Sequence, residues 1–294
     1  MSTSKRILVV GASQPLGEHI AACLARTGHK VIATSRLDSA DFRKTIRSIG
    51  ASPERLDLTD RRAVAKIAPS FDLAVLTPIL SISGEAARIL SEGGVRRGIV
   101  FSSNNVAITP EEPVYGALRK QEVKLQGACP DWAIIRPTMI YGYPGDGNLS
   151  GLLKTLSWVP LFPVPGNGKA VQQPIHVEDL AQIATALANG DWDASGILPI
   201  GGPDAVTHRA MLQLIKRIAG GKGIILPLPV GPVKSAVTVA SELGIRLPLT
   251  PAQIGRVDLN KAAVDPADVP DDLVPQTPLE TGLRNLATEM GLKP

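Results

Sequence analysis

Two glycines, Gly11 and Gly17, stand where a short apolar run ends and an amphipathic stretch begins. Glycine at the first position allows a tight turn after a strand, and glycine at the last lets the following helix pack closely on that strand. The start of such a helix presents unpaired backbone N–H groups and the positive end of the helix dipole, which together attract a pyrophosphate. Gln14 takes the place that a third glycine usually has. The loop therefore indicates the phosphate-binding turn of a dinucleotide site.

Arg36 follows the next apolar run, Lys30–Thr34. In dinucleotide-binding folds, an acidic residue about 20 residues past the loop holds the ribose hydroxyls and selects NAD, whereas an arginine accepts the 2′-phosphate of NADP. The carboxylate is absent here and the arginine is present. We therefore predict NADP(H) as the cofactor and regard NAD as less favoured. The alternative is that Arg36 is an ordinary solvated surface residue.

Apolar runs alternate with amphipathic stretches along most of the chain, which predicts alternating strands and helices. The predicted strands are Ile7–Val10, Lys30–Thr34, Glu54–Asp57, Asp72–Leu76, Gly98–Phe101, Trp132–Arg136 and Ile197–Ile200. The predicted helices are Leu16–Arg26, Asp41–Ile49, one capped by Thr59 or Asp60, Gly84–Leu90, one opened by Pro113, Leu149–Ser157 and Thr207–Ala219. This alternation predicts an α/β fold, a Rossmann doubly wound parallel sheet of about seven strands.

Beyond residue 136, prolines and glycines interrupt the pattern, and the strand–helix alternation returns only in part. We therefore divide the chain into a Rossmann domain and a small, interleaved C-terminal substrate lobe. The Rossmann domain spans 1–140 and is rejoined by 170–202, whereas the lobe spans 141–169 and 203–294.

Composition and charge argue against several classes of function. The formal net charge is only +4, with no arginine-rich run and no interleaved aromatics, which argues against a nucleic-acid partner. Cys23 and Cys129 form no CxxC or Cys/His cluster, so we expect no metal site and no disulfide framework. No apolar stretch reaches membrane-spanning length, and no signal segment precedes the first strand. We therefore expect a cytoplasmic protein without a membrane partner.

Five short motifs, in this order, resemble the extended and atypical branch of the short-chain dehydrogenase/reductase superfamily, which includes NAD-dependent epimerases and dehydratases. They are the Gly11/Gly17 loop, Asp57-Leu58, Phe101-Ser102-Ser103, Tyr115, and Arg136-Pro137-Thr138-Met139-Ile140-Tyr141-Gly142. His176-Val177-Glu178-Asp179-Leu180 resembles a further segment of the family. The resemblance covers roughly residues 5–220.

The resemblance implies a cofactor role for each matching position. Asp57 would bind the adenine amino group, and Leu58 would line the adenine pocket. The turn Arg136–Gly142 would pass close to the nicotinamide. Helix capping is the alternative role for Asp57, and a rigid turn leading to the lobe is the alternative for Arg136–Gly142. The residues implied to contact the cofactor are Gly11, Ser13, Gln14, Leu16, Gly17, Arg36, Asp57, Leu58, Thr77, Pro78, Ser102, Tyr115, Arg119 and Pro137.

The family's catalytic group consists of a serine or threonine, a tyrosine, and a lysine four residues after the tyrosine. The matching positions here are Asn104, Tyr115 and Arg119. Tyr115 would be the acid/base, Arg119 would hold the ribose, and Asn104 would orient the substrate carbonyl. Arginine is not a conservative substitute for lysine, and an amide cannot share a hydroxyl proton as serine does. The group therefore departs from the family pattern at two positions.

Two classes of function stay open at this point. One is an NADP(H)-dependent oxidoreductase that reduces or oxidises a carbonyl or hydroxyl on a small molecule. The other is a catalytically impaired NADP-binding sensor or regulatory protein, favoured by the two changed positions. A nucleotide-sugar epimerase or dehydratase is a weaker alternative, because Arg36 argues against a tightly held NAD. Family members often pair through the helix that carries Tyr115, which leaves a homodimer open.

Overall fold

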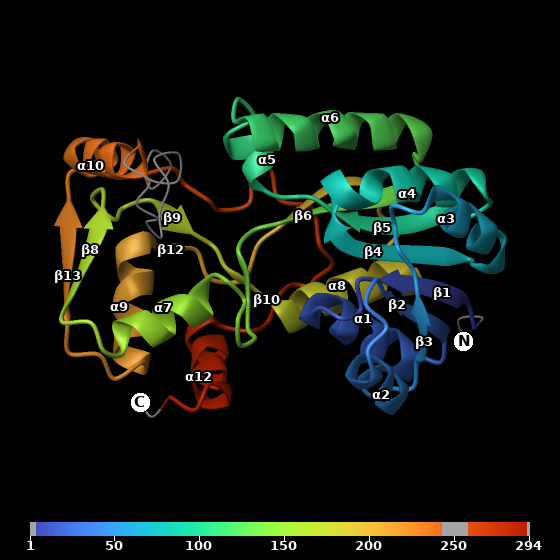
Figure 1. Cartoon of the computed structure of the whole chain (residues 1–294), viewed down its shortest axis with the longest axis horizontal. Coiled ribbons are helices and arrows are strands. Elements are labelled where there is room, and N and C mark those ends of the chain that lie inside the picture. Colours follow the sequence, from blue (N-terminus) through green and yellow to red (C-terminus); the bar gives the residue numbers. More distant parts are fainter. Residues whose placement is uncertain (1–3, 243–257, 293–294) are drawn as a thin grey trace. The chain divides into compact units, whose positions relative to one another are not determined.

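The computed structural model describes residues 4–242 and 258–292, and the chain forms two compact units (Figure 1). Unit 1 comprises residues 1–138, 175–201 and 263–276, and unit 2 comprises residues 139–174, 202–262 and 277–294. The sequence-based division assigned all of 203–294 to the lobe, whereas residues 263–276 group with the sheet-containing unit. That short segment carries no strand or helix pattern that could have revealed its return.

Unit 1 is built on a seven-stranded sheet with the strand order β11-β6-β5-β4-β1-β2-β3. The strands are β1 (Arg6–Val10), β2 (Lys30–Ser35), β3 (Ser52–Arg55), β4 (Leu73–Ile79), β5 (Arg97–Phe101), β6 (Trp132–Pro137) and β11 (Gly196–Ile200). All neighbouring strands in this sheet are parallel. The predicted fold class is confirmed. The strand order reverses between β1 and β4, where open α/β sheets bind their ligands beyond the carboxyl ends of the strands.

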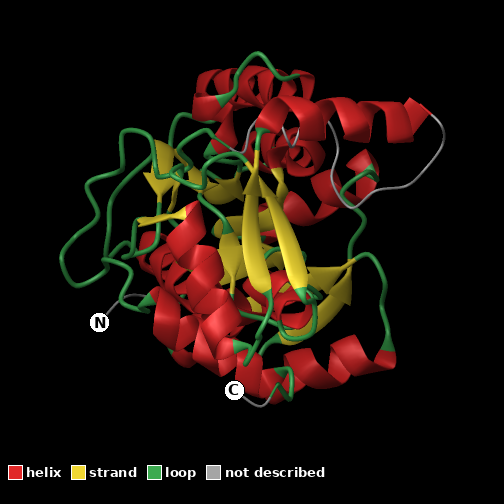
Figure 2. Cartoon of the chain, turned by 90° about the vertical axis from the view of Figure 1, so that its left-hand side faces the viewer, coloured by secondary structure: helices red, strands yellow, loops and turns green. Residues whose placement is uncertain are grey.

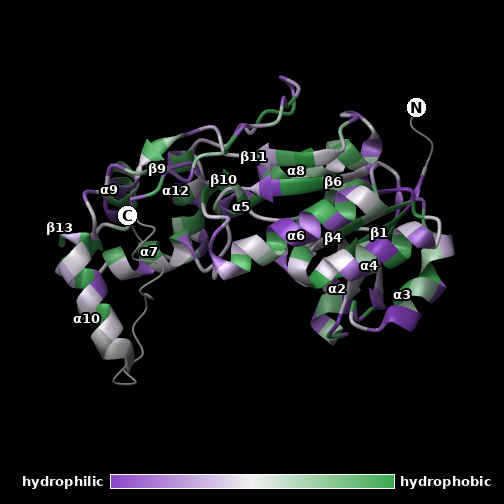
Figure 3. Ribbon diagram, turned by 90° about the horizontal axis from the view of Figure 1, so that it is seen from above, coloured by the Kyte–Doolittle hydropathy of each residue, from purple (hydrophilic) through white to green (hydrophobic). Residues whose placement is uncertain are grey.

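Helices cover both faces of the sheet (Figure 1). One face is covered by α3 (Arg61–Ile67), α4 (Leu80–Glu92) and α6 (Pro113–Ala128), and the other by α1 (Pro15–Arg26), α2 (Ala40–Ser48) and α8 (Val177–Asn189). The short elements η1 (Ala68–Ser70), α5 (Asn105–Ile108) and β10 (Ile175–His176) complete unit 1. Helix α8 is mostly buried and strongly hydrophobic, green in Figure 3, as befits a helix packed against α1.

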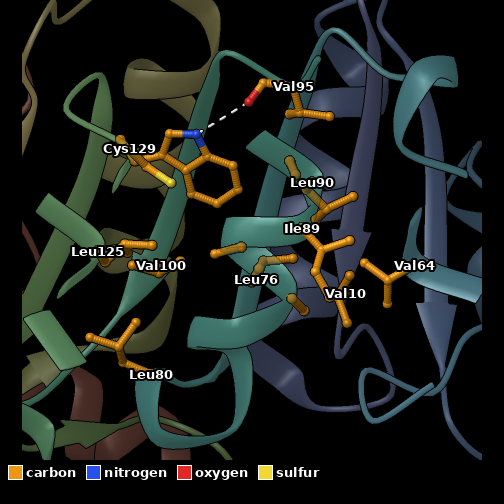
Figure 4. Packing of buried hydrophobic residues seen from close by; sticks show 14 of the residues in the cluster. Val10, Val64, Leu76, Leu80, Ile89, Leu90, Val95, Val100, Leu125 and Cys129 are labelled. Carbon is orange, nitrogen blue, oxygen red and sulfur yellow. Dashed lines mark hydrogen bonds between the residues drawn. The ribbon is translucent and has the colours of Figure 1, made fainter. Parts of the chain in front are cut away.

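Aliphatic side chains dominate the core between the sheet and the α3, α4 and α6 layer (Figure 4). Trp132 at the start of β6 is 1% exposed, and its Nε1 donates to the Val95 carbonyl oxygen at 3.3 Å. Gly98 on the neighbouring strand is required for this packing, because a Cβ there would lie 2.6 Å from the Trp132 ring. The indole therefore fills the core while its single polar atom keeps a partner.

The predicted third strand, 54–57, begins two residues too late, since β3 starts at Ser52. This strand lies at the edge of the sheet and consists of partly exposed polar residues and a proline. A hydrophobic pattern does not identify such a strand, because neither of its faces is deeply buried.

Unit 2 is built around three helices, α7 (Leu149–Leu156), α9 (His208–Ile218) and α12 (Leu279–Glu289), which pack on one another. Its strands are β7 (Ile140–Tyr141), β8 (Leu161–Pro165), β9 (Val171–Gln172), β12 (Val206–Thr207) and β13 (Ile224–Leu228), and a further helix is α10 (Val230–Glu242). Strands β8 and β13 run side by side as a parallel pair (Figure 2). The structure confirms the helices predicted near 149–157 and 207–219, whereas β13, α10 and α12 lie in the tail for which no elements were predicted.

Candidate functional site

The loop between β1 and α1 has a geometry that depends on its two glycines. Gly11 has a φ of +85°, a backbone conformation that residues other than glycine rarely adopt. A Cβ at this position would lie 2.4 Å from the Thr77 Oγ1 atom. A Cβ at Gly17 would lie 2.6 Å from the Gly11 carbonyl oxygen. The N–H groups of Gly11 and Ala12 both donate to the Thr34 carbonyl oxygen at 3.0 Å. The turn is thus tied to β2, and α1 starts directly against it.

The N-terminus of α1 is the part of this loop that suits an anion. Pro15 occupies the first turn and has no N–H, so the backbone donors there are those of Leu16 and Gly17. Gln14 precedes the helix, but its side chain does not cap it. Capping would have satisfied one of these donors from within the protein, so the end of α1 is left open to an anionic ligand.

A cavity of about 360 Å³ opens beside this loop. Of the residues predicted to contact a cofactor, it is lined by Gly11, Ser13, Gln14, Arg36, Asp57, Leu58 and Pro78. Thr77 adjoins the same turn, with its Oγ1 donating to the Val10 carbonyl oxygen at 2.9 Å. The cavity therefore lies at the carboxyl ends of β1 and β4, where the strand order reverses, the place expected for a ligand in this type of sheet.

Two apolar residues on the cavity wall were missed by the sequence analysis. Leu37 and Ile82 line it although their exposed fractions are 72% and 58%. Exposed apolar side chains at the mouth of a cavity provide a surface for a flat, apolar ring system. Leu37 could have been predicted, because it directly follows Arg36 in the sequence. Ile82 could not, because the pattern around it is that of an ordinary helix.

Asp57 is held in its ionised form. Its Oδ1 accepts hydrogen bonds from the Thr59 backbone N–H at 2.9 Å and from the Thr59 hydroxyl at 2.7 Å. These two bonds hold the pKa of Asp57 below its usual value, and the nearby charges of Arg36 and Arg55 act in the same direction. Asp57 does not cap the next helix, because Asp60 accepts from the first N–H groups of α3. The capping alternative for Asp57 is therefore wrong.

Tyr115 lies in the first turn of α6, half-buried against the core. Its Oη accepts a hydrogen bond from the Nδ2 of Asn105 at 3.0 Å. The following residue, Gly116, packs tightly, since a Cβ there would lie 2.9 Å from the Pro110 carbonyl oxygen. Asn105 was not among the predicted site residues, because the family pattern assigns the role to the position before it.

Asn104 is 2% exposed and is bound into the frame of unit 1. Its backbone N–H donates to the Pro137 carbonyl oxygen at 3.1 Å. Its side-chain Oδ1 accepts from the Val264 backbone N–H at 3.1 Å, so the amide anchors the returning segment 263–276. An orienting role for Asn104 towards a substrate carbonyl stays a prediction, and it would have to coexist with this anchoring bond.

Arg119 lies on the exposed surface of α6. It lines a shallow hollow of about 500 Å³ together with Pro110, Gly116, Lys120, Val123 and Lys124. Within 4–242 and 258–292 its side chain makes no hydrogen bond or ion pair. The predicted contact between Arg119 and a ribose stays a prediction, and it would require the long side chain to reorient.

Helix α6 is fixed to β6 by an ion pair that the sequence analysis did not predict. Glu122 has no exposed side-chain surface, and the exposed fraction of the Arg136 side chain is 13%. The Arg136 Nε donates to Glu122 Oε1 at 2.8 Å, and a second guanidinium nitrogen donates to Oε2. A paired, bidentate geometry of this kind is what allows two charges to be buried. The helix that carries Tyr115 is thus held in register with the sheet.

Two further predicted cofactor residues lie at the carboxyl ends of neighbouring strands. Ser102 follows β5, and its buried hydroxyl has no hydrogen-bond partner among the residues that the structure describes. A buried hydroxyl without a partner is costly unless a ligand satisfies it, so Ser102 fits a polar group bound at this end of the sheet. Pro137 ends β6 and is buried. In the described ranges, Ser102, Tyr115, Arg119 and Pro137 do not line the 360 Å³ cavity.

No group of three or more His, Cys, Asp or Glu side chains within 4–242 and 258–292 is arranged to hold a metal ion. In the same residues, no helix combines the length and the apolar character needed to cross a bilayer.

Part of the chain matches a known family model, and its fold is similar to those of solved structures. Residues 7–92 match the model of the NAD dependent epimerase/dehydratase family. Among solved structures, the UDP-glucose 4-epimerase of Thermotoga maritima has a similar fold, with a TM-score of 0.71 at 18% identity, covering 97% of this chain and 98% of that one. At that identity the likeness concerns the fold alone.

Three curated relatives match parts of the chain. An uncharacterized protein, y4nG, of Sinorhizobium fredii is 33% identical over 41% of this chain. The matched segment covers 30% of the length of y4nG. The (4-alkanoyl-5-oxo-2,5-dihydrofuran-3-yl)methyl phosphate reductase of Streptomyces griseus is 25% identical over 73% of this chain and 74% of its own length. The chloroplastic divinyl chlorophyllide a 8-vinyl-reductase of Oryza sativa is 25% identical over 81% of this chain and 64% of its own length.

The expected resemblance is confirmed for the fold and, over residues 7–92, by the match to the family model. The matched segment contains the glycine loop, Arg36, Asp57 and Pro78, which are the residues that gather around the cavity in unit 1. Residues 7–92 thus match the model of the NAD dependent epimerase/dehydratase family, and the fold of the chain is similar to that of the UDP-glucose 4-epimerase of Thermotoga maritima.

Proposed function

We propose that unit 1 binds NADP(H) and that the protein is an oxidoreductase acting on a carbonyl or hydroxyl group of a small molecule. The observation that carries this proposal is the cavity beside the glycine loop, which combines an open helix N-terminus, an ionised Asp57 and the cationic Arg36. The helix end suits a pyrophosphate, the carboxylate suits the adenine amino group, and the guanidinium suits a 2′-phosphate.

The family implies a dinucleotide, and the residues of this chain fit one. Gly11 and Gly17 keep the loop free of side chains on the face where α1 begins, and Leu37 and Ile82 offer apolar surface at the cavity mouth. The buried Ser102 hydroxyl requires a partner that the described part of the protein does not supply. NADP(H), when bound, would supply or accept a hydride.

In this proposal Tyr115 moves the proton that accompanies hydride transfer. Its Oη would donate to a carbonyl oxygen during reduction, or accept from a hydroxyl during oxidation. Helix α6 holds Tyr115 through the Glu122–Arg136 pair and the packing at Gly116. We retain Arg119 as the proposed ribose contact and Asn104 as the proposed contact to the substrate carbonyl.

Two of the curated relatives are reductases by name, which supports the oxidoreductase class without naming a substrate for this chain. Homodimer formation through α6 stays a prediction; Val114 and Val123 on that helix are 67% and 65% exposed. A sugar-nucleotide epimerase is less favoured, because Arg36 rather than a carboxylate follows β2.

A non-catalytic NADP(H)-binding sensor is the second candidate. Two observations favour it. The side-chain oxygen of Asn104 already accepts a hydrogen bond from the Val264 backbone N–H, and Arg119 lines an exposed hollow. Both candidates share the cofactor cavity, so they differ only in whether Tyr115 supports turnover.

Replacing Arg36 by alanine tests the cofactor assignment. We expect the dissociation constant for NADPH to rise by about 10–100-fold, because a charge-assisted contact to the 2′-phosphate is lost. The dissociation constant for NADH should change by less than about twofold, since NADH has no 2′-phosphate. Both constants are measured by isothermal titration calorimetry on the full chain.

The matched control is Arg47→Ala, which removes an exposed arginine from α2 and lies outside the cavity. It should leave both dissociation constants unchanged. Equal losses of NADPH and NADH affinity in Arg36→Ala would rule out the NADP assignment.

A further inference from the structure

We propose that Asn105 is a positioning residue that directs the hydroxyl of Tyr115 for proton transfer. The inference rests on the proposed function, in which Tyr115 moves the proton. The direct observation is the hydrogen bond from Asn105 Nδ2 to Tyr115 Oη at 3.0 Å. It joins α5 to the first turn of α6, two elements that pack on each other within unit 1.

The direction of this hydrogen bond determines what the tyrosine can do. A phenolic hydroxyl has one proton to donate and lone pairs with which to accept. Because Asn105 is the donor, this bond occupies a lone pair of Oη and does not use the tyrosine proton. A carboxylate at the same position would instead accept a hydrogen bond from the tyrosine hydroxyl and compete with a substrate carbonyl for it.

Asn105 is itself held by its surroundings. Its backbone N–H donates to Ser103 Oγ at 3.3 Å, and its carbonyl oxygen accepts from the Thr109 N–H at 2.9 Å and from the Thr109 hydroxyl at 3.3 Å. The backbone next to Tyr115 is held by the close packing of Gly116 on the Pro110 carbonyl oxygen. Both ends of the Asn105–Tyr115 bond are therefore fixed by local structure, as a positioning contact requires.

The neighbouring residue explains why the role falls on position 105. The Oδ1 of Asn104 is occupied by the Val264 backbone N–H, and Asn104 is almost completely buried. Successive residues at the start of a helix point about 100° apart, so Asn104 faces the returning segment while Asn105 faces α6. Each of the two adjacent asparagines thus has a distinct partner.

Nuclear magnetic resonance tests the contact without requiring any activity. In full-length protein labelled with ¹⁵N-asparagine, Asn105→Asp identifies the side-chain amide signals of Asn105 by their disappearance. We expect Tyr115→Phe to move these signals, since the ring stays in place while the acceptor oxygen is removed. The exposed Asn285 of α12 provides the matched control, because its amide signals should not move. Asn105 signals that stay in place in Tyr115→Phe would overturn the inference.

Steady-state kinetics tests the role. We expect Asn105→Ala to lower kcat about 10-fold while the affinity for NADPH changes by less than about twofold. Asn105→Asp should be slower than Asn105→Ala, because its carboxylate accepts a hydrogen bond from the tyrosine hydroxyl, whereas Asn105→Ser should recover part of the loss by restoring a donor. Asn285→Ala should leave kcat unchanged.

The two proposals fail in different ways. A wild-type protein that binds NADP(H) but turns over no carbonyl or hydroxyl substrate contradicts the oxidoreductase function, and the kinetic role of Asn105 is then rejected with it. A wild-type protein that turns over while Asn105→Ala keeps its full kcat contradicts the inference alone. A kcat of Asn105→Asp equal to that of the wild type would also overturn the inference on Asn105, because the hydrogen-bond donor would then be dispensable.

Discussion

Replacing Glu122 by leucine is expected to lower the free energy of unfolding by about 3–5 kcal/mol, because it leaves the guanidinium of Arg136 buried without its carboxylate. Glu122 has no exposed side-chain surface, so water cannot replace the lost partner. The matched double variant Glu122→Leu/Arg136→Met should recover most of the loss, since two apolar side chains can fill the same space. Urea-induced unfolding followed by circular dichroism measures all three proteins.

An exposed ion pair supplies the control for this prediction. Glu85 and Arg88 on α4 pair at 2.9 Å, but their side chains are 49% and 36% exposed. Glu85→Gln should change the free energy of unfolding by less than about 1 kcal/mol. If Glu122→Leu were no more destabilising than Glu85→Gln, the pair would not be what holds α6 on β6.

Replacing Tyr115 by phenylalanine is expected to lower kcat/KM by about 10²–10⁴-fold, the usual contribution of a positioned acid/base. The assay follows NADPH absorbance with a panel of aldehydes, ketones and keto-sugars. The affinity for NADPH should stay within about twofold of wild type, because Tyr115 does not line the cavity that we assign to the adenine end. The ring keeps its packing in this variant, so the free energy of unfolding serves as the check on folding.

Full activity of Tyr115→Phe on every substrate that the wild type turns over would contradict the oxidoreductase mechanism. Turnover would then have to use another proton donor. Absence of turnover in the wild type, together with tight NADP(H) binding, would instead favour the sensor.

The regular part of the fold could be predicted because its signals are local. The run Ile7–Val10 and the glycines after it specify a strand, a turn and a helix, and the structure has β1 and α1 there. The same reasoning located Ile197–Ile200 as the last strand of the sheet. Buried parallel strands are easily predicted from the sequence, because both of their faces are apolar.

The elements that were missed lack such signals. Strand β3 is polar because it is an edge, and β13 is partly exposed and contains a proline. The return of residues 263–276 to unit 1 depends on single hydrogen bonds, such as those to Asn104 Oδ1 and from Ala267 to Pro199, which no local pattern encodes. Long-range contacts of this kind follow from the assembled sheet and not from composition.

The candidate site likewise contains residues that the sequence predicts and one that it does not. Gly11, Arg36 and Asp57 could be predicted, because each occupies a position fixed by the strand–turn–helix order, and the structure brings them to one cavity. Asn105 could not be predicted, because a family pattern assigns chemistry to the residue before it. Which of two adjacent asparagines faces Tyr115 depends on how α5 packs on α6, and only the three-dimensional structure provides that.

Native mass spectrometry of the full chain, incubated with equal concentrations of NADPH and NADH, tests the central claim that the cavity beside the glycine loop holds NADP(H). We expect a complex with a single NADPH, present in clear excess over any complex with NADH. The same experiment on Arg36→Ala should abolish that preference, because the contact to the 2′-phosphate is removed. Preferential binding of NADH by the wild type, or no binding of either dinucleotide, would contradict it.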